Sequence, residues 1–317
     1  MRRIGVLLLA AMTALPVFAE VPKCKLTKVA ELPVTLEHNR PLIPAKINGQ
    51  DVFFLIDTGS YATFIRPAAA AALGLEGRDL EGDVIGVDGA AGMGSVMIDD
   101  LVIDRLHLRN KPYRLHGSKT EKPSTPLVAG VLGNDMWSHF DVEFDLAHNL
   151  VTLFKPQDCD HANLAYWSSD YLEADFIHTL NAEYHHVTLR VQVNGQPVKA
   201  VLDSGATVSA LTLEGAKLAG IGPDSPGVSN AGTLRGSGGK EIPAWSARFD
   251  RFELAGEAVK NVTLRFADMF DHENDFSSLR GTGLILGVDF IKSHRLLISH
   301  SQDKIYFTFN GGRIFAD

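Results

Sequence analysis

The stretches FLIDTGS (residues 54–60) and AVLDSGA (residues 200–206) are two copies of one pattern. In each copy, apolar residues run directly into an aspartate that a small hydroxyl residue and a glycine follow. The two aspartates, Asp57 and Asp203, are 146 residues apart in a chain of 317 residues. The sequence therefore predicts a duplicated fold with one aspartate in each half.

Three further segments repeat in the same order. Two of them keep the spacing of 146 residues, and the third is 154 residues apart, so the second half carries a small net insertion. They are residues 47–50 with 193–196, 73–75 with 219–221, and 131–137 with 285–291. A lone Asp-Thr-Gly occurs in ordinary turns, but agreement in order, residue type and spacing indicates an internal duplication.

Each half has the pattern of β-structure. Residues 187–193 alternate apolar and polar side chains, which is the period of a half-buried strand. The Asn-Gly that follows predicts a hairpin turn, and residues 68–73 predict a short helix that ends at Gly74. Further strands are expected at residues 99–108, 151–154, 248–254 and 305–308. The predicted fold class is all-β, mainly strands with short helices.

Two glycine-rich stretches occupy equivalent places in the halves, at residues 86–94 and 232–239. They are either exposed hairpin loops or mobile flaps over a binding cleft, because glycine permits both a tight turn and motion. No strand–loop–helix unit surrounds the Gly-x-Gly fragment of the first stretch, so we exclude a dinucleotide site. The flap candidates are Val87, Asp88, Gly89, Arg235, Gly236 and Ser237.

Two carboxyl groups that share one proton can hydrolyse a peptide bond without a metal. Like charges a few ångströms apart cannot both ionise easily, so the pair retains a proton. The ionised partner takes a proton from water, and the protonated partner donates to the scissile carbonyl. An approximate two-fold axis between the repeats would bring Asp57 and Asp203 together. We therefore predict that these two residues are catalytic, with loop support from Thr58, Gly59, Ser60, Ser204, Gly205 and Ala206.

These motifs resemble the aspartic peptidase superfamily, and within it the retropepsin-like branch. Asp57-Thr58-Gly59-Ser60 and Asp203-Ser204-Gly205 are similar to the family's active-site loops. The apolar-apolar-Gly blocks at residues 131–133 and 285–287 are similar to the segments that pack beneath those loops. The resemblance covers residues 30–310. It implies two pseudo-symmetric closed β-barrel lobes of the acid-protease fold, a cleft between them, and endopeptidase activity on a peptide or protein substrate without a cofactor or metal.

The expected organisation follows from the repeat. We expect a signal peptide at residues 1–19, an N-terminal lobe at 20–157, an interlobe linker at 158–184 and a C-terminal lobe at 185–317. Because one chain carries both halves of the site, the active species is expected to be a monomer.

The N-terminus predicts export. A positive start, an apolar run over residues 4–15 and the small residues before Glu20 are typical of a signal peptide. The alternative is a membrane anchor, for which the run is short. The mature chain is expected to be periplasmic or secreted and free of the membrane. The full sequence has a formal net charge of −8, which gives no reason to expect a nucleic-acid partner.

Cys24 and Cys159 are the two cysteines of the chain. In an oxidising compartment they can form one disulfide, which would tie the N-terminal segment to the interlobe connection. The alternative is two unpaired thiols.

Other candidate sites are weaker. Neighbouring residues of a strand point to opposite faces, so His185 and His186 are poorly placed to share a metal. Residues 236–238 lack the Gly-x-Ser-x-Gly spacing of a serine-hydrolase elbow. The glycosylation sequon at residues 261–263 matters only in a eukaryotic source. Asp135 and Asp289 are expected to be structural rather than catalytic.

Two other functions compete with peptidase activity. One is a non-catalytic periplasmic peptide-binding protein that keeps the cleft, although binding alone does not need a pair of carboxyl groups that share a proton. The other is a structural envelope protein, which would need no paired aspartate loops.

One difference between the loops leads to a hypothesis about the proton. Ser60 follows Gly59, whereas Ala206 follows Gly205. A hydrogen bond from the Ser60 hydroxyl would favour the ionised form of Asp57, although Thr207 could compensate at Asp203. The sequence therefore predicts that Asp203 holds the shared proton.

Overall fold

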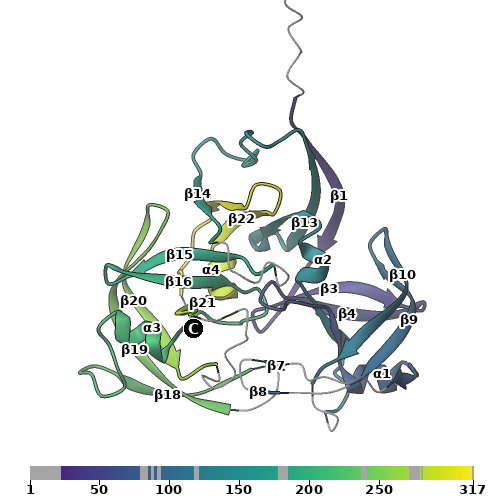
Figure 1. Cartoon of the computed structure of the whole chain (residues 1–317), viewed down its shortest axis with the longest axis horizontal. Coiled ribbons are helices and arrows are strands. Elements are labelled where there is room, and N and C mark those ends of the chain that lie inside the picture. The colour runs from purple at the N-terminus through teal and green to yellow at the C-terminus, as the bar shows by residue number, and fades with distance from the viewer. Residues whose placement is uncertain are drawn as a thin grey trace, which may run out of the picture.

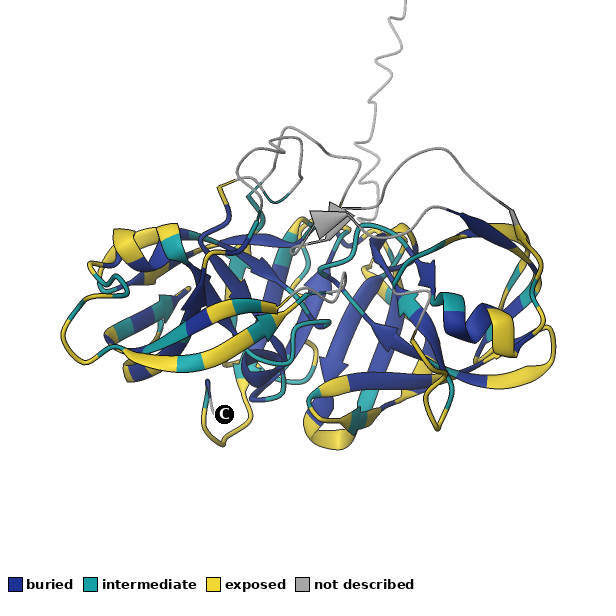
Figure 2. Cartoon of the chain, turned by 90° about the horizontal axis from the view of Figure 1, so that it is seen from below, coloured by how far each residue is buried: buried dark blue, intermediate teal, exposed yellow. Residues whose placement is uncertain are grey.

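The computed structural model describes residues 23–78, 85–86, 89–90, 94–117, 121–177, 185–236, 241–270, 279 and 281–315. Two β-barrel lobes lie side by side, and a third sheet joins them (Figure 1). Buried residues occupy the strands inside each lobe, while the turns at the outer ends are exposed (Figure 2). The all-β prediction is confirmed.

The N-terminal barrel closes because its first and last strands pair, with Lys46 opposite Val102. The strands, in spatial order, are β3 (Arg40–Ile47), β4 (Gln50–Ile56), β11 (Val128–Leu132), β5 (Phe64–Ile65), β10 (Leu106–Leu115) and β9 (Ser95–Ile103). β2 (Thr35–Glu37) extends the sheet beside β3, and β6 (Gly77–Arg78) extends it beside β9.

The C-terminal barrel repeats this strand order and closes where Val193 pairs with Phe252. Its strands are β15 (Thr188–Val193), β16 (Gln196–Leu202), β21 (Leu284–Leu286), β17 (Ala210–Thr212), β20 (Glu257–Ala267) and β19 (Glu241–Leu254), with β18 (Ser229–Arg235) beside β19. The short helices are α1 (Pro67–Ala72), α2 (Asn134–Trp137), α3 (Leu213–Leu218), α4 (Val288–Ile291) and a 3-10 turn at Leu146–His148. Equal strand order in the two lobes is the structural form of the sequence repeat.

The Asn-Gly turns fix the first hairpin of each barrel. Asn48 and Gly49 have φ of 48° and 83°, and Asn194 and Gly195 have φ of 52° and 77°. Positive φ at both central residues is the type I′ turn, which matches the right-handed twist of the flanking strands. The predicted hairpins are therefore present.

One predicted strand is wrong in its extent. Residues 99–108 do not form a single strand, because the chain turns between β9 and β10 at Asp104, which has φ of 52°. Asp104 adopts the left-handed region although it is not a glycine. No glycine or proline therefore marks this turn in the sequence.

Six strands from both halves form the interlobe sheet: β1 (Lys25–Pro33), β13 (Leu150–Gln157), β12 (Asp141–Asp145), β22 (His294–Ser299), β23 (Lys304–Phe309) and β14 (Leu172–Asp175). The lobes meet where β12 pairs with β22 in antiparallel register. The predicted final strands of both halves lie here, as does β14, which belongs to the expected linker. The linker is therefore partly strand, and residues 178–184 lie outside the described part.

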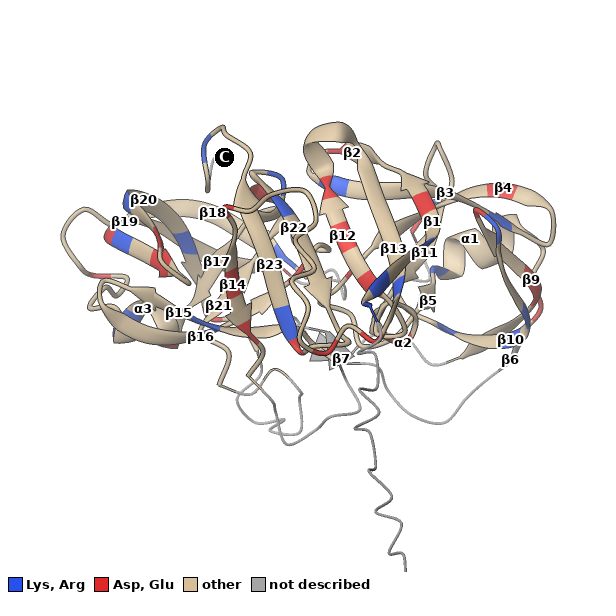
Figure 3. Cartoon of the chain, turned by 90° about the horizontal axis from the view of Figure 1, so that it is seen from above, with Lys and Arg blue, Asp and Glu red and all other residues tan. Residues whose placement is uncertain are grey.

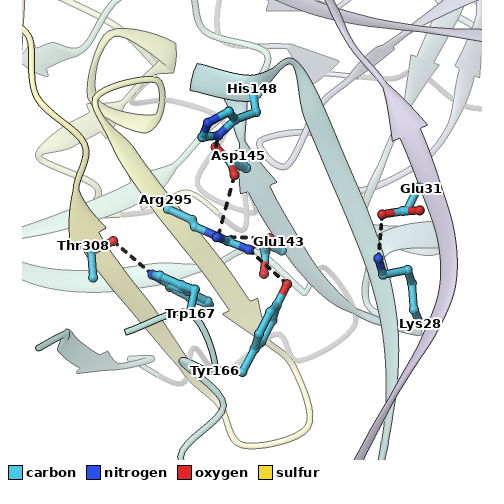
Figure 4. Close-up of polar contacts among 9 residues, drawn as sticks. All are labelled: Lys28, Glu31, Glu143, Asp145, His148, Tyr166, Trp167, Arg295 and Thr308. Carbon is cyan, nitrogen blue, oxygen red and sulfur yellow. Dashed lines mark hydrogen bonds and ion pairs between the residues drawn. The ribbon is translucent and has the colours of Figure 1, made fainter. Parts of the chain in front are cut away.

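Charged residues of both signs lie interspersed over the lobes (Figure 3). Across the interlobe sheet, Arg295 of β22 donates to Glu143 of β12 at 2.9 Å and to the Tyr166 hydroxyl at 3.1 Å (Figure 4). The guanidinium also lies over the Trp167 ring, 4.9 Å from its centroid. These contacts link strands from the two halves to the connection between them.

The predicted disulfide between Cys24 and Cys159 is present, with a Cα–Cα distance of 4.4 Å. It closes a loop of 135 residues beside the paired ends of β1 and β13. Among the described residues, no helix is long and apolar enough to cross a membrane.

Replacing both cysteines by serine is expected to lower the free energy of unfolding by about 2–5 kcal/mol, because the unfolded chain regains the freedom of a long loop. Urea unfolding of the double variant measures the loss, and reduced wild-type protein is its matched control. Equal midpoints for the variant and the oxidised wild type would contradict a stabilising role.

Candidate active site

The two predicted aspartates stand at equivalent strand ends. Asp57 follows β4 and Asp203 follows β16, and each strand pairs in parallel with the strand of its apolar-apolar-Gly block. The Asp57 amide donates to Leu132 at 3.1 Å, and the Asp203 amide donates to Leu286 at 2.8 Å. Each repeated block therefore anchors the loop that carries an aspartate.

Thr58 and Ser204 lock the two loops together by four hydrogen bonds. The Thr58 amide donates to the Ser204 hydroxyl and the Ser204 amide to the Thr58 hydroxyl, both at 3.0 Å. Each hydroxyl then donates at 2.8 Å across the lobes, Thr58 to Leu202 and Ser204 to Ile56. These bonds fit the loop support predicted for Thr58 and Ser204, and they couple the position of each aspartate to the opposite lobe.

The Ser204→Ala variant is expected to lose about 2–4 kcal/mol of unfolding free energy, because the buried Thr58 amide and Ile56 carbonyl both lose their partner. Denaturant unfolding measures this loss. Ser60→Ala removes a hydroxyl from the same region that contacts only its own loop, so it is the matched control and is expected to cost less than about 1 kcal/mol. Equal losses of unfolding free energy in the two variants would contradict a stabilising role for the hydrogen bonds between the two loops.

Gly59 and Gly205 lie against the carboxyl groups of the opposite loops. A Cβ at Gly59 would stand 2.3 Å from the Asp203 Cγ, and one at Gly205 would stand 2.4 Å from the Asp57 Cγ. No side chain fits at these distances. The glycines are therefore required by close approach across the two-fold axis.

The carboxyl groups of Asp57 and Asp203 are partly buried and hydrogen-bonded to each other. Burial raises the pKa of both, and the Asp203 charge raises the pKa of Asp57 further, to well above its ordinary value. Backbone N–H donors oppose this shift: Gly59 to Asp57 at 3.0 Å, and Gly205 and Ala206 to Asp203 at 2.8 and 3.1 Å. The geometry suits a pair that keeps one proton above the usual range of carboxyl groups.

The predicted role of Ser60 is wrong. Its hydroxyl donates to the Ala62 carbonyl at 2.8 Å instead of to Asp57. The Ala206 amide, together with Gly205, favours the ionised form of Asp203, and a hydrogen bond from Asp57 lowers the pKa of Asp203 as well. The Ser60 backbone N–H lowers the pKa of Asp57 in the same way. The hydroxyl contact that would make Asp203 the holder of the shared proton is therefore absent.

Asp135 and Asp289 have partners within their own lobes. The Thr63 hydroxyl donates to Asp135 at 2.8 Å, and the Ser209 hydroxyl donates to Asp289 at 2.6 Å. The same hydroxyl of Ser209 accepts from Gly287 at 2.9 Å. These contacts fit the structural role expected of both carboxylates, which is to fix the blocks beneath the loops.

The described parts of both glycine-rich stretches include paired strands. β7 (Ile85–Gly86) pairs with β8 (Gly89–Ala90), which contains the flap candidate Gly89. In the other lobe, β18 and β19 pair as far as Arg235 and Glu241, and Gly236 follows. The candidates Val87, Asp88 and Ser237 lie outside the described residues, so flap function stays a prediction.

Sequence reasoning did not assign Asn134 or His186 to the site. The buried Asn134 side chain donates to the Thr58 carbonyl at 2.8 Å, and the His186 ring lies beside it. The sequence signal that could have indicated Asn134 was a difference between the repeats, because the equivalent residue in the second half is Val288. Among the described residues, His, Cys, Asp and Glu form no group of three or more that could hold a metal ion.

Comparison with known families agrees with this geometry. The aspartyl protease family model matches two segments, residues 43–136 and 189–290, which include both aspartate loops. The chain belongs to the aspartyl protease family. Each matched segment begins in the first barrel strand and ends in the helix after the apolar-apolar-Gly block, so the family match follows the internal duplication.

A solved relative supports the fold of this aspartyl protease family member. The crystal structure of an aspartic proteinase from Irpex lacteus matches with a TM-score of 0.51 and 10% sequence identity, over 88% of this chain and 97% of the other. No curated protein sequence matches this chain. The structural likeness establishes the two-lobed acid-protease architecture.

Proposed function

We propose that this chain is an aspartic endopeptidase in which Asp57 and Asp203 activate a water molecule. The observation that carries the proposal is the contact between the two partly buried carboxyl groups, one from each lobe, within interlocked loops. A binding protein would have no use for this arrangement, because two acids in contact are costly to bury.

The chemistry follows from one shared proton. The ionised carboxylate takes a proton from water, and the water oxygen attacks the scissile carbonyl carbon while the protonated carboxyl donates to the carbonyl oxygen. Collapse of the tetrahedral intermediate breaks the C–N bond. The amine leaves with a proton from the pair, and a hydroxyl group of the intermediate returns its proton to the pair as the product carboxyl group forms. The N–H groups of Gly59, Gly205 and Ala206 hold the carboxylates in place during both steps.

The proposed substrate is an extended peptide or an unfolded protein segment bound between the lobes. The reaction needs no cofactor, because the carboxyl pair supplies both the acid and the base. The paired hairpins β7–β8 and β18–β19 are proposed to cover the substrate. We further propose that the active enzyme is a monomer that is exported to the periplasm or secreted, where the disulfide can persist.

The test is cleavage of an unfolded protein mixture across acidic to neutral pH. Activity is expected to pass through a maximum, falling in acid when both carboxyl groups are protonated and at higher pH when both are ionised. Because burial raises both pKa values, activity should persist above the ordinary range of carboxyl groups. A folded protein that binds peptides but cleaves none at any pH would instead support the peptide-binding alternative.

A further inference from the structure

The peptide unit between Thr58 and Gly59 links the catalytic pair to residues outside the loop. Its N–H end, on Gly59, donates to Asp57 Oδ1 at 3.0 Å and also lowers the pKa of Asp203. Its carbonyl end, on Thr58, points to a different set of partners. Anything that orients this carbonyl also orients the N–H, because the peptide unit is planar.

Two side chains meet this carbonyl, one from each lobe. Asn134, at the start of α2, donates its Nδ2 at 2.8 Å and is fully buried. The His186 ring, just before β15, also hydrogen-bonds the Thr58 backbone, and its Nδ1 lies 3.5 Å from the Asn134 Nδ2. A carbonyl oxygen has two lone pairs and can accept both donors.

The other lobe does not repeat this arrangement. The repeat places Val288 where Asn134 stands, and a valine side chain has no donor for the Ser204 carbonyl. It places Arg40, which is exposed, at the position of His186. The segment before β3 still reaches across, but Asn39 there donates to Thr207 at 3.1 Å instead. The two catalytic loops are therefore supported differently.

We propose that Asn134 and His186 are positioning residues that act on the catalytic pair through the Thr58–Gly59 peptide unit. Hydrogen bonds at the carbonyl fix the peptide plane and polarise it, so that the Gly59 N–H becomes a stronger donor to the carboxylates. This stabilises the singly ionised pair, which is the reactive form. The inference deepens the proposed peptidase function and rests on it for its kinetic part.

The surroundings of His186 suit this role. Burial, together with the charges of Lys199 and His185, lowers the pKa of His186 to about 4. The ring is therefore neutral over most of the acidic to neutral range, where one N–H donates and the other nitrogen needs no anionic partner. A neutral donor can hold the carbonyl without placing a charge beside the catalytic pair.

The first test is titration of the aspartate carboxyl groups by ¹³C NMR without substrate. In Asn134→Val, which copies the other lobe, and in His186→Leu, the lower apparent pKa of the pair is expected to rise by roughly half a unit to one unit. His185→Asn is the matched control, because asparagine tolerates the left-handed backbone at this exposed neighbour. An unchanged titration in both variants would overturn the proposal, whether or not the protein is a peptidase.

The second test is kinetic. Both variants are expected to lower kcat about tenfold with KM little changed, and to move the acidic limb of the kcat/KM profile upward. His186→Asn and His186→Gln keep an N–H donor, so at least one of them should restore the wild-type profile. Loss of kcat in all His186 variants with an unmoved acidic limb would indicate a merely structural role and overturn the inference. His186 is only partly buried, so its variants test the proposal even if Asn134→Val fails to fold.

Discussion

Asp203→Asn is expected to lower kcat by at least about a thousandfold, and Asp57→Asn to do the same. An amide in the pair can neither take a proton from water nor share one with its neighbour. The double variant should be little worse than either single variant, because the two carboxyl groups act as one unit. Steady-state hydrolysis of a peptide identified from the protein mixture measures all three.

The same substitutions are expected to change stability in a pH-dependent way. The folded pair binds more protons than the unfolded chain above the ordinary aspartate pKa of about 4, because burial raises both pKa values. Wild-type stability should therefore fall as pH rises through that range, while the asparagine variants lose less. Thermal unfolding across pH tests this, with the exposed Asp51→Asn as control. For the kinetic prediction, substantial turnover in either Asp57→Asn or Asp203→Asn would show that the catalytic pair is wrongly assigned.

The duplicated motif made the barrels and the aspartate pair predictable. Strand periodicity, the Asn-Gly turns and the equal spacing of the loops are local signals, and each has a direct structural counterpart. The interlobe sheet has no such signal, since β12 meets β22 from the other half of the chain. The pairing of strands from opposite halves of the chain depends on how the two lobes pack together. It therefore could not be predicted from residue patterns.

Within the site, the sequence predicted which residues meet but not every hydrogen bond between them. Ser60 was expected to contact Asp57, but backbone N–H groups occupy that carboxylate and the hydroxyl turns to Ala62. Asn134 and His186 were missed as a pair because they belong to different lobes and meet only at the Thr58 carbonyl. Where the two halves carry different residues at equivalent positions, the contacts in one lobe do not predict those in the other.

Gly59→Ala and Gly205→Ala are expected to abolish most activity, by at least about a hundredfold in kcat. Neither glycine has positive φ, so alanine causes no backbone strain at these positions. Any loss of activity therefore comes from overlap of the new methyl group with its neighbours. The new methyl group would overlap the opposite carboxyl group, at 2.3–2.5 Å, and must push the aspartates apart. Crowding of this kind also costs about 1–3 kcal/mol of unfolding free energy. Activity and denaturant unfolding of each purified variant measure the two effects.

Gly222→Ala is the matched control, because the space around that glycine is open within 4 Å and its φ is not positive. It should leave both kcat and stability near the wild-type values. The two active-site variants separate geometry from acid strength, since neither changes an ionisable group. If Gly59→Ala and Gly205→Ala kept wild-type kcat, catalysis would tolerate separation of the carboxyl groups. A single water activated between Asp57 and Asp203 requires both groups within hydrogen-bond reach, so that result would exclude the proposed mechanism.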